Sequence, residues 1–241
     1  MNIMGTDRKK MRMLARLMPA LFLFCALPGT AAKAMRPADF DYAEAKQRID
    51  KRIKFPDFKG DITVVMGCVS RVKASGKMTD TGCYLKNNYD EPFADAVANA
   101  AKKARMNPAL IGGKPREIFL QFRVAFVRKG EAQEIRFVPN PGYEENTKAY
   151  GQQHVAGQRA IGRNEPWKDA CPKRAHYSVW VLAYLGEDGH ADSPSIEHAD
   201  GIMPTPTCLD AIRQTIIDSS YTPALADGEP VPSTYIEPFS N

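Results

Sequence analysis

A ten-residue motif occurs twice in this chain of 241 residues. "MNPALIGGKP" spans Met106–Pro115, and "YTPALADGEP" spans Tyr221–Pro230. The two copies share Pro-Ala-Leu, the second glycine and the final proline. A repeat of this kind indicates that one supersecondary unit is present twice, so we expect two similar halves.

A helix is predicted directly before each copy of the motif. "FADAVANAAKKAR", Phe93–Arg105, and "CLDAIRQTIIDSS", Cys208–Ser220, both place apolar residues at helical spacing. A proline precedes each segment, at Pro92 and Pro206, where a first helical turn tolerates its missing N–H. The motif therefore follows a helix in both halves.

A β-hairpin is predicted before each helix. Asp61–Leu85 and Tyr177–Glu197 are both rich in valine, isoleucine or aromatic residues, which favour strands. Ser75-Gly76 and Asp188-Gly189 mark the turns, because glycine tolerates positive φ.

A final strand is predicted after each copy of the motif. Arg116–Val127 alternates apolar and mostly polar residues, and Val231–Phe239 is its counterpart. Pro115 and Pro230 would lie where these strands begin, one of the few places where a strand accepts proline. We therefore expect an α+β fold of two small repeats, each with a hairpin, one helix and a final strand in an antiparallel sheet packed on the helix.

The N-terminal segment reads as a targeting signal. Residues 1–34 contain a basic head, an apolar run of 13 residues at Leu17–Gly29 and a small-residue exit at Ala32-Lys33-Ala34. An uncleaved inner-membrane anchor is the alternative, although the run is shorter than the roughly 20 residues of a membrane-spanning helix. The expected organisation is this signal, a first domain over 35–128, a linker over 129–175 and a second domain over 176–241.

The net positive charge of the chain comes from the signal segment. Residues 35–241 hold 27 basic and 27 acidic side chains, so the charge balance gives no support for nucleic-acid binding. The charges are nevertheless uneven, with 19 basic and 11 acidic residues over 35–130 and 8 basic and 16 acidic residues over 131–241. This asymmetry fits either two differently solvated surfaces or two halves that attract each other.

Four cysteines follow the signal segment, Cys68, Cys83, Cys171 and Cys208, and an even number in an exported chain suggests two disulfides with three possible connectivities. If Ser75-Gly76 forms the centre of the first hairpin, Cys68 faces Cys83, a pair close enough for a disulfide. If Asp188-Gly189 likewise forms the centre of the second hairpin, Val181 faces Ile196. Cys171 would then pair with Cys208 by elimination, and a different turn type would shift this register.

The combined pattern resembles the TonB C-terminal domain family. The resemblance is carried by "MNPALIGGKPREIFLQFRVAFV" and "YTPALADGEPVPSTYIEPF", with "KFPDFKGDITVVMGCV" before the first strand. It implies a small periplasmic α+β domain that binds a segment of an outer-membrane receptor as an added strand beside its last strand. Since this chain lacks the family's proline-rich spacer, the resemblance supports partner binding more than energy transduction.

Carried over to this sequence, the resemblance makes the last strand of the first repeat the binding edge, with Val231–Phe239 as its counterpart. The candidate partner-binding residues are Arg116, Ile118, Leu120, Phe122 and Val124. The expected partner is a protein, and the resemblance implies an outer-membrane receptor. Membrane association is expected only if the N-terminal segment is retained.

No catalytic residue, cofactor or metal site is predicted. His190 and His198 lie near Asp192 and Glu197, but the spacing matches no metalloprotease motif. The glycines of the first motif copy follow a helix, whereas a phosphate-binding loop precedes one. An envelope enzyme or a metal-binding protein, with a site between the two halves, is the alternative to a non-enzymatic interaction module.

Overall fold

The computed structural model describes residues 35–40, 47–163, 165–173 and 176–240. The expected signal over residues 1–34 lies outside this part of the chain. Within the described ranges, no helix is long and apolar enough to cross a membrane.

The first repeat forms one sheet with a helix against it. Strands β1 (Ile62–Val72), β2 (Met78–Cys83) and β5 (Ile118–Lys129) run in the order β5-β1-β2, all antiparallel. The helix α2 (Glu91–Ala101), preceded by the short 3-10 helix η3 (Asn88–Asp90), buries Phe93 and Val97 against the sheet.

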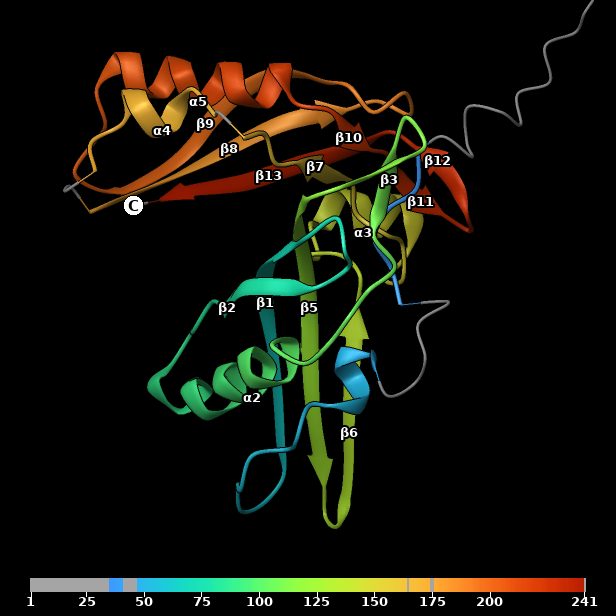
Figure 1. The fold of residues 1–241 in the computed structure, drawn as a ribbon. Coiled ribbons are helices and arrows are strands. Elements are labelled where there is room, and N and C mark those ends of the chain that lie inside the picture. Colours follow the sequence, from blue (N-terminus) through green and yellow to red (C-terminus); the bar gives the residue numbers. More distant parts are fainter. Residues whose placement is uncertain (1–34, 41–46, 164, 174–175, 241) are drawn as a thin grey trace, which may run out of the picture.

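The second repeat has the same plan. Strands β8 (Tyr177–Leu185), β9 (Ala191–Gly201) and β13 (Ser233–Ser240) form the sheet β13-β8-β9, and α5 (Pro206–Asp218) covers one face of it. The predicted α+β fold is confirmed. Figure 1 shows this second sheet lying across the end of the longer first sheet.

Both hairpins depart from the predicted turn in the same way. The first turn is closed by Lys73 N–H donating to the Lys77 carbonyl, which leaves three residues in the loop rather than two. A bulge between Val69 and Arg71 then restores the predicted register, so Cys68 still faces Cys83. The second hairpin also has a three-residue loop, closed by Gly186 N–H donating to the His190 carbonyl. A bulge between Leu182 and Tyr184 again restores the predicted register, so Val181 faces Ile196.

The bulges themselves are equivalent. Asp80 in the first repeat and Ser193 in the second both adopt a φ of 51°, which is unusual for residues other than glycine. Each lies on the returning strand of its hairpin. The predicted disulfide pair was therefore correct although the turn type was not, because the bulge offsets the longer loop.

Each copy of the repeated motif forms a small hairpin of its own. Strand β3 (Ala109–Ile111) pairs with β4 (Lys114–Arg116), and β11 (Ala224–Ala226) pairs with β12 (Glu229–Val231). The prolines therefore belong to these short hairpins, opposite Leu110 and Leu225, and do not begin the final strands as predicted.

The segment expected as a linker is folded. Strand β6 (Ala132–Val138) pairs with β5. Helix α3 (Glu144–Tyr150), β7 (Gln158–Ala160) and α4 (Trp167–Ala170) follow.

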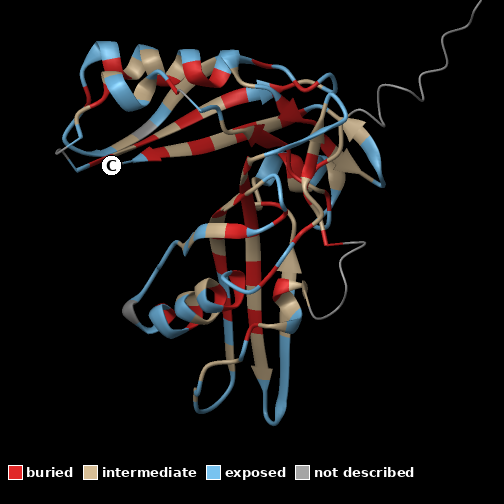
Figure 2. Cartoon of the chain, in the orientation of Figure 1, coloured by how far each residue is buried: buried red, intermediate tan, exposed pale blue. Residues whose placement is uncertain are grey.

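Strand β7 joins the two repeats. It pairs with β5 on one side and with β10 (Tyr221–Thr222) of the second repeat on the other. Two separate hydrophobic cores, one per repeat, flank this connection, and Figure 2 shows buried residues alternating along their strands.

Before β1 the chain forms the 3-10 helix η2 (Ile49–Lys51). Residues 41–46 lie outside the described part. Ile49 is fully buried in the first core, so this segment packs on the same side of the sheet as α2.

Both predicted disulfides are present, Cys68–Cys83 and Cys171–Cys208. The first joins two strands at the position that Val181 and Ile196 occupy in the second repeat. The second ties the segment after α4 to the first turn of α5.

Candidate functional site

A buried ion-pair network lies where the two repeats meet. Arg159 on β7 contacts Glu237 on β13 at 2.7 Å and Glu165 at 2.6 Å, and all three side chains are at most 6% exposed. Lys168 lies 3.0 Å from Glu165 and supplies a second positive charge. Two carboxylates are thus matched by two cations.

The remaining polar atoms of this network also have partners. Tyr235 donates to Glu237, and the indole N–H of Trp167 donates to Glu165 at 3.1 Å. The Arg159 guanidinium lies 5.7 Å from the centre of the Phe239 ring, within the range of a cation–π contact. A buried charge is stable only when it is paired and hydrogen-bonded, and this arrangement meets both conditions.

The network shifts the pKa values of Arg159 and Glu165 toward their ionised forms. Burial alone would lower the pKa of Arg159, but the neighbouring Glu237 and Glu165 carboxylates hold it well above its usual value. Burial alone would raise the pKa of Glu165, but Arg159 and Lys168 hold it below its usual value. Both groups therefore remain charged across the physiological pH range.

Tyrosines beside the network remain protonated. Burial, with a smaller effect of the Glu237 charge, raises the pKa of Tyr84 to about 12. The pKa of Tyr235 is likewise raised by burial and by Glu237. Tyr235 therefore donates a hydrogen bond to Glu237, and the Tyr84 ring packs against Trp180.

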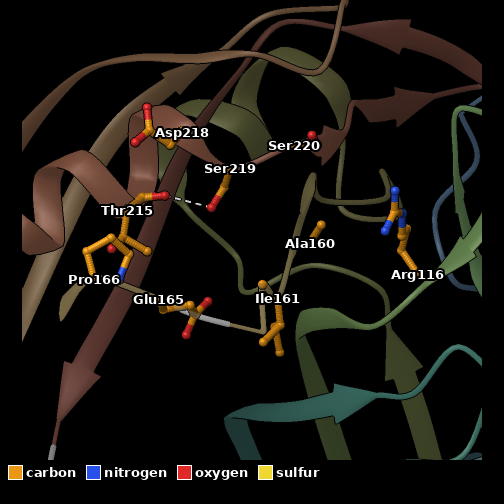
Figure 3. Close-up of a pocket in the computed structure, with 10 residues that line it drawn as sticks. Arg116, Ala160, Ile161, Glu165, Pro166, Thr215, Asp218, Ser219 and Ser220 are labelled. Atoms are coloured by element: carbon orange, nitrogen blue, oxygen red, sulfur yellow. Dashed lines mark hydrogen bonds between the residues drawn. The ribbon is translucent and has the colours of Figure 1, made fainter. Parts of the chain in front are cut away.

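A pocket of about 260 Å³ opens over the network (Figure 3). Arg116 of the first repeat, Glu165 of the connecting segment and the end of α5 contribute to its wall. Its lining comprises Arg116, Ala160, Ile161, Gly162, Glu165, Pro166, Thr215, Asp218, Ser219 and Ser220.

The hydroxyl groups of this pocket are not arranged as nucleophiles. Ser219 donates to the Thr215 carbonyl at 2.6 Å, and Thr215 donates to the Ala211 carbonyl at 2.8 Å. An activated hydroxyl needs an adjacent base, whereas the charged group near Ser219 is the Arg159 cation at 3.3 Å. The Thr215 and Ser219 hydroxyl groups therefore bond the last turns of α5.

A second feature of the junction is the outer edge of β13. Among the described strands only β8 pairs with it. Side chains contact its outward backbone groups instead. Asn146 of α3 accepts from Thr234 N–H at 3.0 Å and donates to the Thr234 carbonyl at 2.7 Å, as a residue of a neighbouring strand would.

Other side chains continue this cover along β13. Gln121 donates to the Ile236 carbonyl at 2.7 Å, and the Tyr143 hydroxyl lies 2.8 Å from the same oxygen. Tyr150 donates to the Pro232 carbonyl at 2.7 Å. Burial of the Tyr143 phenol, followed by the nearby Tyr84 and Glu237, raises its pKa, so it remains a donor.

The predicted binding strand is not an edge strand. Beyond its pairing with β1, β5 pairs with β7 at Ile118–Phe119 and with β6 over residues 123–129. The expectation of an open edge here was wrong because the polar segment after β5 turns at Gly130 and folds back onto it.

The side chains predicted to contact a partner mostly face the core. Ile118, Leu120, Phe122 and Val124 are at most 1% exposed, and Arg116 lies on β4 at the junction pocket. Binding of a partner through these residues stays a prediction. Their alternation is the signature of a half-buried strand, and it does not distinguish an edge from an inner strand.

Local sequence signals for the residues that build the junction are weak. Arg159, Glu165 and Asn146 lie in a polar stretch without periodicity, so only tertiary contact reveals their burial. A glutamate between alternating apolar residues, as in "TYIEPF", is the one local sign that Glu237 points inward.

No group of three or more histidine, cysteine, aspartate or glutamate side chains in the described ranges could hold a metal ion. The histidine with the clearest role is His154, which is buried and whose Nδ1 lies 2.7 Å from the Gly151 carbonyl.

The two disulfides are compatible with an oxidising, extracytoplasmic compartment. Comparisons of the chain with protein-family models, with curated proteins and with solved structures find no match.

Proposed function

We propose that this chain is a periplasmic, non-enzymatic interaction module that binds an extended segment of a protein partner by strand addition at the outer edge of β13. The observation that carries the proposal is the Asn146–Thr234 pair, in which one side-chain amide occupies both backbone groups that an added strand would bond.

The first repeat provides an internal example of the same geometry. There the chain's own β6 and β7 lie antiparallel on the outer side of β5, the counterpart of β13. In the second repeat that position is covered by side chains from α3 and from Gln121. An added strand would have to displace this side-chain cover from the edge, but it would not have to break a backbone pair of the β13-β8-β9 sheet.

The resemblance to the TonB C-terminal domain family supports an outer-membrane receptor as the partner. Pro238, which lacks an N–H, limits the edge beyond Ile236, so the added segment would be short. The catalytic alternative has less support, since the junction pocket pairs its hydroxyl groups with backbone carbonyls.

Site-specific photocrosslinking in intact cells tests this proposal. A photoreactive residue at Thr234 or Ser240 on β13 should form adducts with one envelope protein, mapped to one extended segment. The matched control places the same group at Asp192, an exposed residue of β9. Equal adducts at Asp192, or a purified protein with a stoichiometric metal or turnover, would contradict strand addition at β13.

A further inference from the structure

A basic hollow lies between η2 and α2, away from the junction of the repeats. It has a volume of about 480 Å³. Its walls carry four cationic side chains, Lys51, Arg52, Lys54 and Lys103, and no carboxylate is among the described residues that line it.

The floor of the hollow is made by small side chains. Ala96 and Ala100 of α2 face it, and Asn99 adds an amide. Ala100 is 5% exposed and belongs to the first core, so the floor is fixed by packing. Small-ligand sites are concave and combine apolar surface with a few placed polar or charged groups, and this hollow has both components.

The cations are poorly compensated within the described part of the chain. Lys51 lies 3.7 Å from Asp50, but that carboxylate also pairs with Arg48 at 3.1 Å. No ion pair links Arg52, Lys54 or Lys103 to any described carboxylate. The Nε atom of Arg52 is buried without a hydrogen-bond partner, an arrangement that folded proteins usually avoid.

Helix stability alone does not account for this cluster. Lys103 lies just beyond the C-terminal end of α2, where a cation interacts favourably with the helix dipole. The other three cations belong to the separate segment around η2, and they line the hollow together with the last turn of α2, whose dipole offsets only part of four positive charges. Their convergence raises the positive potential of the hollow, which an anion would relieve.

The geometry points to a binding site for a phosphate-bearing polyanion in this hollow, with Arg52 and Lys103 as its main ligands. The planar guanidinium can pair two phosphate oxygens, and the lysine ammonium groups supply further donors. Two sources share this chemistry, a soluble oligophosphate and the phosphorylated headgroup of a lipid. The site is independent of the β13 edge.

Calorimetric titration of the purified chain with sodium tripolyphosphate at low ionic strength tests the site. Saturable binding is expected, and Arg52→Gln or Lys103→Gln should weaken it on the order of tenfold, the loss of one charge-assisted contact. Lys129→Gln, which removes an equal charge from an exposed position on β5, should leave the affinity within a factor of about two.

Ala96→Leu fills the hollow without changing charge and should also reduce binding, with retained folding verified by thermal melting. Flotation with phosphatidylglycerol vesicles, against phosphatidylcholine vesicles, identifies the source. Binding of vesicles but not tripolyphosphate assigns a lipid headgroup, and the reverse assigns a soluble anion. Absence of both, or an equal loss in Lys129→Gln, overturns the proposal.

Discussion

The side-chain amide of Asn146 bonds both backbone groups of Thr234, 88 residues further along the chain. It joins α3, which lies in the segment between the repeats, to the last strand of the second repeat. Asn146 is only 4% exposed, so solvent cannot replace these bonds when the side chain is removed.

Replacement of Asn146 by alanine should lower the free energy of unfolding by about 1–3 kcal/mol, because two partly buried backbone groups of Thr234 lose their partners. Hydrogen exchange at the Thr234 amide should accelerate in the same variant. Urea denaturation and exchange measurements test this expectation. Thr147→Ala, at the half-buried neighbouring position whose hydroxyl bonds within α3, is the control, and an unchanged Thr234 exchange rate in Asn146→Ala would show that the contact is not formed.

Asn146→Ala also distinguishes a purely structural role of the Asn146–Thr234 contact from a role as the cover of a partner-binding edge. If α3 covers a partner-binding edge, Asn146→Ala should increase photocrosslinking at Ser240 while reducing stability. If the contact is only structural, crosslinking falls or stays constant as stability falls. The ratio of crosslinked to total folded protein is the quantity to measure.

The turn glycines of the two hairpins should be equally intolerant of alanine. A Cβ on Gly76 would lie 1.9 Å from the Met106 carbonyl oxygen, and one on Gly189 would lie 2.5 Å from the Tyr221 carbonyl oxygen. Both glycines also have positive φ, at 79° and 76°. Either substitution should cost more than the roughly 1 kcal/mol of φ strain alone.

Gly82→Ala is the matched control, because its Cβ would meet no atom within 4 Å and its φ is not positive. Thermal melting should show a loss of stability for Gly76→Ala and Gly189→Ala and little change for Gly82→Ala. A similar melting temperature for all three variants would contradict the close approach of the motif to the hairpin turn.

The two disulfides should differ in how easily they are replaced. Cys68–Cys83 closes 15 residues and Cys171–Cys208 closes 37, for which loop entropy gives about 3 and about 4 kcal/mol. The Cys68–Cys83 pair can also be replaced by valine and isoleucine, the residues that the second repeat has at the equivalent positions. Cys68→Val with Cys83→Ile should therefore lose less stability than Cys171→Ala with Cys208→Ala.

Urea denaturation of both double variants without reductant measures this difference. The comparison also tests whether the repeats are structurally equivalent. Val181 and Ile196 occupy, in the second repeat, the positions that correspond to Cys68 and Cys83. A larger loss for the valine–isoleucine pair would show that the two hairpin environments are not interchangeable.

Elements with strong local periodicity could be predicted from the sequence, and the contacts between repeats could not. The alternation along β5 and the helical spacing of α2 are local signals of burial, and both elements are present. The pairing of β6 with β5 depends on the direction of the turn at Gly130. The residues of β5 alone therefore could not show whether β5 is an edge strand or an inner strand.

The junction site was harder still to predict. Arg159 and Glu237 are 78 residues apart, and each alone would be taken as a surface charge. Their burial follows from the way β7 lies between β5 and β10, which no local pattern encodes. The Cys68–Cys83 pairing, by contrast, could be predicted from the hairpin register. In both hairpins the extra loop residue shifts the register, and a bulge on the returning strand shifts it back.

The junction network should make the fold sensitive to acid through Glu165. Its pKa in the folded chain is lowered, so its contribution to stability is present above the pKa of an unfolded glutamate, about 4.3, and is lost as pH falls through the lower folded value. Glu165→Gln should remove this part of the pH dependence, lower stability at neutral pH and have less effect near pH 3. Glu229→Gln, at an exposed position, should keep the wild-type profile. Urea midpoints from pH 3 to pH 7 measure these slopes, and parallel profiles for wild type and Glu165→Gln would mean that Glu165 is not ionised beside Arg159.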